Sequence, residues 1–245
     1  MPLLKQARFA ACLLGFVLAF SAQAAPLVVL DPGHNPDDGG ATSIRGTREV
    51  AYNDRFVREL APALRRAGWQ VAVTRDPGTP IGLVERAELA NRLHAALFLS
   101  IHHDSAQPRY LEKVRQGGLV GYRTVKPIEG YSLYVSGENP CFARSRQLAT
   151  LLGEQLRRLG RPPALHHAER IPGEGRPLLN RYLGIYRHDA LAVLRHSQVP
   201  AVLLEVGVIT DPRDEAYVND SRNRGKMIRG IVRALQLFVR EARDR

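Results

Sequence analysis

The chain alternates between short apolar runs and longer segments with a helical spacing of apolar residues. Short apolar runs predict strands at 27–31, 69–74, 96–101, 131–136, 190–194 and 200–206. Helical spacing predicts helices at 49–67, 83–94, 142–159 and 222–243. Pro62 predicts a kink or a break in the first helix, because proline removes a helix hydrogen bond. Strands that alternate with helices predict an α/β fold, as a single domain with a mostly parallel twisted sheet flanked by helices on both faces.

Two long segments, 102–130 and 160–183, lack a clear period, and the second is rich in Pro, Gly and Arg. Loops of this length in a compact domain are usually functional or mobile. In parallel sheets, reactive groups gather where strands run out into loops. The pattern therefore predicts that any chemistry lies at the carboxyl ends of the strands.

The first 24 residues have the pattern of a secretory signal peptide. Lys5 and Arg8 precede an apolar run at 9–20, and Ala22-Gln23-Ala24 has the form of a cleavage site. The run is too short to span a bilayer comfortably, so no transmembrane anchor is expected after processing. We expect an exported, periplasmic protein whose mature domain spans 25–245.

Composition narrows the class of partner. The formal charge is +11, mostly from arginine spread along the chain, so the protein should be attracted to polyanions. An exported chain without a nucleic-acid motif favours an anionic envelope polymer or lipid surface, and we expect no nucleic acid partner. The mature part holds one cysteine, Cys141, so it has no internal disulfide framework.

Candidate chemistry lies at four separated positions beside the apolar runs: His34, Glu49, His102 and Glu205. Two imidazoles and one carboxylate suit a catalytic zinc that keeps a position open for water, and a further carboxylate suits a base. Taken singly, each residue has an ordinary explanation. Glu205 is the exception, since a lone carboxylate in an apolar run is costly to bury without a partner. His103 rivals His102, because neighbours on a strand point to opposite faces.

These segments resemble, in order, the zinc-dependent N-acetylmuramoyl-L-alanine amidases of bacterial cell-wall turnover, of the amidase-3 type. The matching motifs are Asp31-Pro32-Gly33-His34, Arg48-Glu49, Ser100-Ile101-His102 and Glu205-Val206-Gly207, supported by Thr74-Arg75-Asp76, Glu85-Arg86 and Val193-Leu194-Arg195. The resemblance implies that His34, Glu49 and His102 hold Zn²⁺, and it favours His102 over His103. It also implies that Glu205 is the catalytic acid/base. The implied reaction is hydrolysis of the amide bond between N-acetylmuramic acid and L-alanine in peptidoglycan or its fragments.

Some features depart from the family or leave alternatives open. His103-Asp104 stands where the family often has Ala-Asn, which places an extra carboxylate beside the metal. That carboxylate could orient a ligand imidazole or alter which substrates are accepted. Segment 160–183 holds too many Pro and Gly residues to form the inhibitory helix of some relatives.

Two other functions remain open at this point: a zinc peptidase that cuts within wall stem peptides, and a non-catalytic wall-binding protein on the same fold. Arg45, Arg48 and Arg195 are candidates for holding substrate carboxylates, although surface solvation is the favoured role for any one of them. No residue identifies an activator protein or an oligomeric state.

Overall fold

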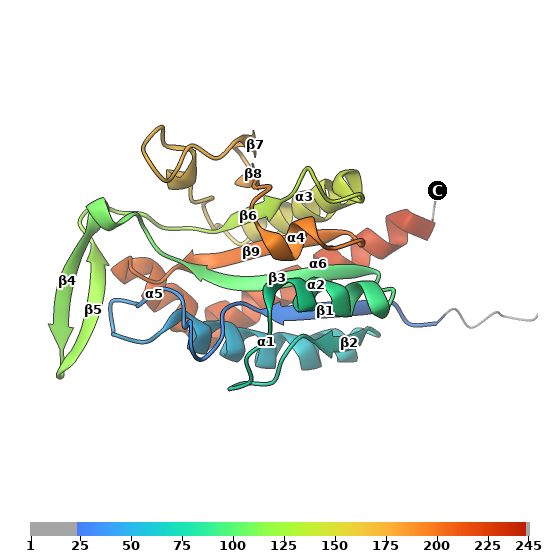
Figure 1. The fold of residues 1–245 in the computed structure, drawn as a ribbon, viewed down its shortest axis with the longest axis horizontal. Coiled ribbons are helices and arrows are strands. Elements are labelled where there is room, and N and C mark those ends of the chain that lie inside the picture. The colour runs from blue at the N-terminus through green and yellow to red at the C-terminus, as the bar shows by residue number, and fades with distance from the viewer. Residues whose placement is uncertain (1–23, 244–245) are drawn as a thin grey trace, which may run out of the picture.

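The computed structural model describes residues 24–243 and places them around a seven-stranded sheet (Figure 1). The predicted signal peptide falls almost wholly outside the described residues. In spatial order the strands are β2 (Gln70–Val73), β1 (Leu27–Pro32), β3 (Leu97–Asp104), β9 (Ala201–Val208), β6 (Ser132–Val135), β8 (Ile185–Arg187) and β7 (Leu178–Asn180). Strands β2, β1, β3 and β9 are parallel neighbours, while β6 runs antiparallel to β9. The prediction of a mostly parallel α/β sheet is confirmed.

Helices cover both faces of the sheet, as predicted. The helices are α1 (Glu49–Arg66), α2 (Leu83–Arg92), α3 (Phe142–Arg158), α4 (Ala192–Arg195), α5 (Pro212–Asn219) and α6 (Ser221–Arg243). Helices α1, α3 and α6 pack on one face, and α2 and α4 pack on the other (Figure 1). Each face has its own buried apolar cluster, so the sheet is the central layer of the core. None of the helices in residues 24–243 has the length and apolar character needed to cross a membrane.

A kink or a break was expected at Pro62, and helix α1 continues through this residue without a break. Its buried side chains, among them Phe56, Leu60 and Leu64, form a continuous apolar stripe against the sheet. Burial of such side chains contributes about 1.5–3 kcal/mol each, which outweighs the loss of one helix hydrogen bond. Tertiary packing therefore overrides the local signal.

The strand predicted at 190–194 is wrong, because Ala192–Arg195 forms the short helix α4. Its buried residues Val193 and Leu194 pack in the cluster beneath α2 and β9. A short apolar run has too few residues for its period to separate a strand from one helical turn.

The segment 102–130 was expected to be irregular, but it contains a β-hairpin. Strand β4 (Leu111–Gln116) pairs with β5 (Leu119–Thr124) through the two-residue turn Gly117-Gly118. Both glycines have positive φ angles, 53° and 82°, the conformation that tight hairpin turns favour. Figure 1 shows this hairpin projecting at the end of the molecule toward which β3 and β9 point.

Candidate metal centre

The first group of predicted site residues gathers at the carboxyl ends of β1 and β3. His34 follows β1, His102 lies near the end of β3, and Glu49 is the first residue of α1. The three segments meet because β1 and β3 are paired in parallel, with Pro32 beside Ile101, and the Gly33 amide continues the ladder to the Ile101 carbonyl at 2.9 Å. The structure thus brings together residues that lie far apart in the sequence.

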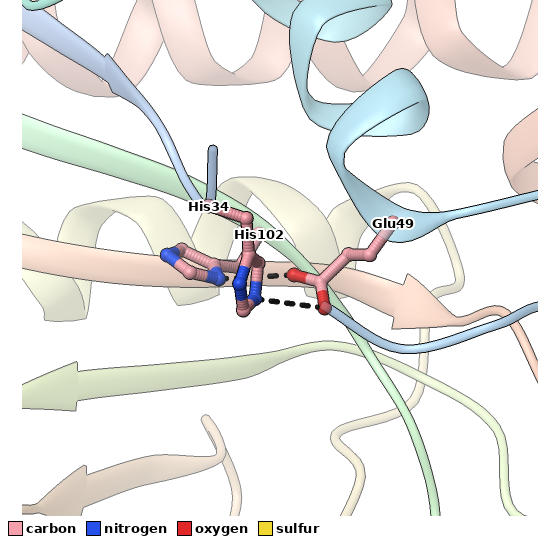
Figure 2. A group of neighbouring side chains, drawn as sticks. All are labelled: His34, Glu49 and His102. Atoms are coloured by element: carbon pink, nitrogen blue, oxygen red, sulfur yellow. Dashed lines mark hydrogen bonds and ion pairs between the residues drawn. The ribbon is translucent and has the colours of Figure 1, made fainter. Parts of the chain in front are cut away.

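Glu49 bridges the two imidazoles (Figure 2). Its Oε2 lies 3.0 Å from His34 Nε2, and its Oε1 lies 3.0 Å from His102 Nδ1. The ligand atoms of His34, Glu49 and His102 all lie within 4.8 Å of one another. Two ring nitrogens and a carboxylate oxygen are ligands that zinc prefers, so the donor set fits this ion. We call these three residues the first cluster.

Backbone and amide donors fix the Glu49 carboxylate in place. Oε2 accepts from the Ala41 amide at 3.1 Å, and Oε1 accepts from the His103 amide at 3.2 Å and from Asn53 at 3.3 Å. Burial alone would raise the pKa of Glu49, but its contacts with His102 and His34 hold that pKa well below its usual range. The residue is therefore an ionised carboxylate, the form that a metal requires.

The backbone at His34 adopts a left-handed conformation, with φ at 64°, which is uncommon for a residue other than glycine. Two buried guanidiniums support it: Arg75 Nε donates to the His34 carbonyl at 2.9 Å, and Arg86 Nη2 donates to the same oxygen at 2.8 Å. Arg86 is paired in turn with buried Asp31 at 2.8 Å. The family motifs around Arg75 and Arg86 thus hold the strained turn that presents His34.

Two glycines leave room around the imidazoles. A Cβ atom on Gly40 would lie 2.5 Å from Glu49 Oε2 and 2.6 Å from His34 Nε2, and a Cβ on Gly33 would overlap the ring of His102. Larger residues at either position would displace the ligand atoms. The fit of the backbone around the first cluster is therefore a second observation that suits a bound ion.

His103 points away from the first cluster. Its Nδ1 lies 2.8 Å from Asn53 Oδ1, and its ring packs 5.5 Å from that of Tyr52 and 6.0 Å from that of Phe56, measured between centroids. Burial lowers the pKa of His103 to about 3, so the ring is neutral. Of the two neighbouring histidines, His102 lies among the candidate ligand atoms and His103 does not.

Glu205 is partly buried on β9, directly beside His102 in the pairing of β3 with β9. Its Oε2 is buried and has no hydrogen-bond partner among residues 24–243. Burial, followed by the negative charges of Asp104 and Glu49, raises the pKa of Glu205 well above its usual range. An unpaired carboxyl next to three candidate ligands is the arrangement expected of an acid/base group.

Two further residues bear on the site: Arg45, which was a candidate for holding substrate carboxylates, and Asn53, which was not predicted. Arg45 is tied to the buried carboxylate of Glu215 at 2.8 Å. It is thus already paired within the protein. Asn53, which orients both Glu49 and His103, was not singled out from the sequence. Its only signal was its position one helical turn after Glu49, on the same face of α1.

The chain is similar to known proteins along most of its length. A family model described as N-acetylmuramoyl-L-alanine amidase matches residues 28–237, which is most of the chain. The chain belongs to the N-acetylmuramoyl-L-alanine amidase family. Among curated relatives of this amidase family, it is similar to the probable cell wall amidase LytH of Staphylococcus saprophyticus, with 27% identity over 216 residues. LytH of Staphylococcus aureus is 29% identical over 213 residues.

These matches cover 87% and 86% of the chain but only 58% and 57% of the two LytH proteins. The chain therefore spans less than three fifths of the length of these curated relatives. The amidase-family chain also superposes on solved structures. An amidase from Clostridium difficile 630 gives a TM-score of 0.68 at 23% identity, with 89% of this chain and 98% of that chain covered. Ami1 from Mycobacterium smegmatis gives 0.65 at 24% identity, with 89% and 98% covered. At these identities the likeness establishes the fold.

Proposed function

We propose that this protein is a zinc-dependent amidase that hydrolyses the amide bond between N-acetylmuramic acid and L-alanine in peptidoglycan or its fragments. His34, Glu49 and His102 hold the zinc, and Glu205 is the acid/base. The observation that carries the proposal is the convergence of the first cluster beside an unpartnered carboxyl, with 3.0 Å contacts from Glu49 to both imidazoles. Membership of the amidase family supports the choice of bond.

The residues divide the work. When bound, zinc supplies a Lewis acid that polarises a carbonyl oxygen and lowers the pKa of a water. Glu205 Oε2 is the atom that takes a proton from the attacking water and returns it to the departing amine. A single carboxyl beside the candidate ligands can accept the proton in one step and release it in the next, so one group serves both steps.

Glu49 and the turn at His34 have a different task, which is positioning. Glu49 is fixed by three protein donors, and His34 is fixed through its backbone by Arg75 and Arg86. Such support would hold His34 and Glu49 in the positions from which they would bind zinc. The His34 and His102 side chains retain 23% and 17% of their exposure, which leaves the first cluster accessible to substrate.

We also propose that the protein acts outside the cytoplasm, in the periplasm. The signal-peptide pattern of residues 1–24 and the basic charge of +11 support this location, since the substrate would be an anionic polymer of the envelope. Sequencing the amino terminus of protein recovered from the periplasm tests it. The expected first residue is Ala25, and recovery of only the unprocessed chain from the cytoplasm would contradict the location.

Digestion of purified peptidoglycan tests the reaction. The expected product is a stem peptide with a new free L-alanine amine, identified by amine labelling and mass spectrometry. New amines within the stem peptide would instead support a peptidase, and binding without any cleavage would support a wall-binding protein.

Glu205→Gln tests the assigned role. General acid–base catalysis typically contributes about 10²–10⁴-fold, so the variant should lose activity by that factor while its zinc content stays that of the parent. The amide is nearly isosteric with the carboxyl, so loss of activity with retained metal separates chemistry from folding. A variant as active as the parent would show that Glu205 is not the acid/base.

A further inference from the structure

A second group of metal-ligating side chains lies where β3 meets the segment after α3. It consists of Asp104 at the end of β3 and the adjacent pair His166 and His167 in a 3₁₀ turn. Their ligand atoms lie within 4.8 Å of one another. We call these three residues the second cluster. None of its members is a proposed zinc ligand or the proposed acid/base, although the charge of Asp104 contributes to the raised pKa of Glu205.

His166 is the member of the second cluster whose ring nitrogens are buried without a hydrogen bond to residues 24–243. The residue is 6% exposed, yet neither of its ring nitrogens has a hydrogen-bond partner in the described part of the chain. Its Nε2 lies 3.4 Å from Asp104 Oδ2, which is long for a hydrogen bond. It is close to the separation of about 3.3 Å between two ligands of a tetrahedral zinc ion. A buried imidazole without a partner is costly, and a cation between these atoms removes that cost.

His167 is oriented as a metal-ligating histidine usually is. Its Nε2 is hydrogen-bonded to Asp104 Oδ2 at 2.7 Å, a contact that an ion bound between these atoms would replace, while its Nδ1 lies 2.9 Å from Glu174 Oε2. Metal-bound imidazoles almost always donate their other N–H to a carboxylate or carbonyl, which fixes the tautomer. Glu174 is itself held by Gln107 at 2.8 Å and by Arg176. The orientation of the His167 ring is thus fixed by protein contacts alone.

A cavity lies beside this place. Its volume is about 480 Å³, and His166 lies in its wall together with Ile128, Pro162, Leu165 and Glu169. Neither Asp104 nor His167 lines this cavity, so it ends at His166, next to the buried ligand atoms.

We propose that Asp104, His166 and His167 bind a second divalent metal ion, of the zinc class, separate from the ion at the first cluster. Two ring nitrogens and one carboxylate oxygen are the same donor set as in the first cluster, and they favour zinc over magnesium or calcium. The role is structural: the ion joins the irregular segment 160–183 to the end of β3. The alternative is that no metal binds there and that His167 is protonated, as an imidazolium between Asp104 and Glu174.

Counting bound metal separates these occupants. The full protein is stripped with a chelator, reloaded by titration with Zn²⁺ alone, desalted and analysed by mass spectrometry of the metal. The parent is expected to hold two equivalents, and His167→Gln and Asp104→Asn one each. His196→Ala, which removes an exposed histidine away from both clusters, should keep two.

The deciding variant is His34→Ala, because it leaves the second cluster untouched. It is expected to retain one equivalent, and Co²⁺ bound in its place should give the visible absorption of a nitrogen- and oxygen-ligated tetrahedral ion. The double variant His34→Ala with His167→Gln should bind none. A His34→Ala variant that binds none, or a double variant that still binds one equivalent, would overturn the proposal, whatever the outcome for amidase activity. A parent that binds one equivalent, kept in His34→Ala and lost in His167→Gln, would instead count against zinc at the first cluster.

Discussion

The two clusters use the same kinds of donor but differ in how open they are. In the first cluster the side chains of His34, Glu49 and His102 are 23%, 6% and 17% exposed. In the second cluster those of Asp104, His166 and His167 are 9%, 4% and 10% exposed. Catalytic zinc sites keep a position open, whereas structural sites are closed. The difference in exposure supports the proposal that the reaction takes place at the first cluster and that the second is structural, a distinction that the donor types alone do not make.

The scaffolds beneath the two clusters differ as well. The first cluster rests on three strand or helix ends whose positions the central sheet fixes. The second rests on one strand end and a segment whose only regular elements are a 3₁₀ turn and the short strand β7. Sites on regular elements are held more rigidly than sites on loops. The comparison therefore predicts that damage at the first cluster changes the reaction, and damage at the second changes the stability of the loop.

The largest expected effect comes from His34→Ala. Loss of a ligand removes Lewis-acid assistance worth several kcal/mol, so kcat/KM on peptidoglycan fragments should fall by roughly 10³-fold, about 4 kcal/mol. His167→Ala should cost less, because the second cluster contains neither a proposed ligand of the first ion nor the proposed acid/base. Steady-state kinetics of both variants, with His196→Ala as the exposed control, checks this. An equal loss in the two variants would contradict the division of roles.

The next effect concerns the buried pair beneath His34. Arg86 and Asp31 are each 1% exposed and lie 2.8 Å apart. Asp31 also accepts from Thr74 at 2.6 Å and Ser100 at 2.7 Å. Arg86→Met leaves a buried carboxylate without its cation, so the free energy of unfolding should fall by about 3 kcal/mol.

The matched change at the second cluster is Arg176→Met, where the arginine side chain is 26% exposed beside Glu174. A partly exposed pair contributes about 1 kcal/mol or less. Urea denaturation of the two variants gives the comparison. If Arg176→Met were the more destabilising, the first cluster would not have the more rigid support.

The first cluster could be predicted from the sequence because strand ends mark it. His34 and His102 each follow an apolar run, and parallel strands bring such positions to one edge of the sheet. The fold class followed from the same alternation. The hydrophobic pattern thus carries information about residues that the sheet positions.

The second cluster could not be found in this way. Asp104 was noted only as an extra carboxylate, and His166 and His167 lie in a segment without periodicity. Nothing local brings that segment to β3. Its path depends on pairings such as the Tyr131 carbonyl with the Ala164 amide at 2.8 Å, which no period in the sequence announces. The hairpin of β4 and β5 is a different case. Its Gly-Gly turn is a recognised hairpin signal in the sequence, and this signal was overlooked.

The smallest expected effect tests the support of the second cluster. In Glu174→Gln the neutral amide still accepts from His167 Nδ1, now 2.9 Å from the carboxylate, but it does so more weakly. Loss of such an outer partner typically lowers metal affinity by about 10–100-fold. We expect about tenfold, measured by competition with a chelating dye in the His34→Ala background, where only the second cluster is intact. Glu112→Gln, in the exposed pair with Arg123 on the hairpin, should leave the affinity unchanged. Unaltered affinity in Glu174→Gln would mean that the carboxylate does not orient a metal ligand. His167 would then be better described as an imidazolium that is ion-paired with Asp104 and Glu174.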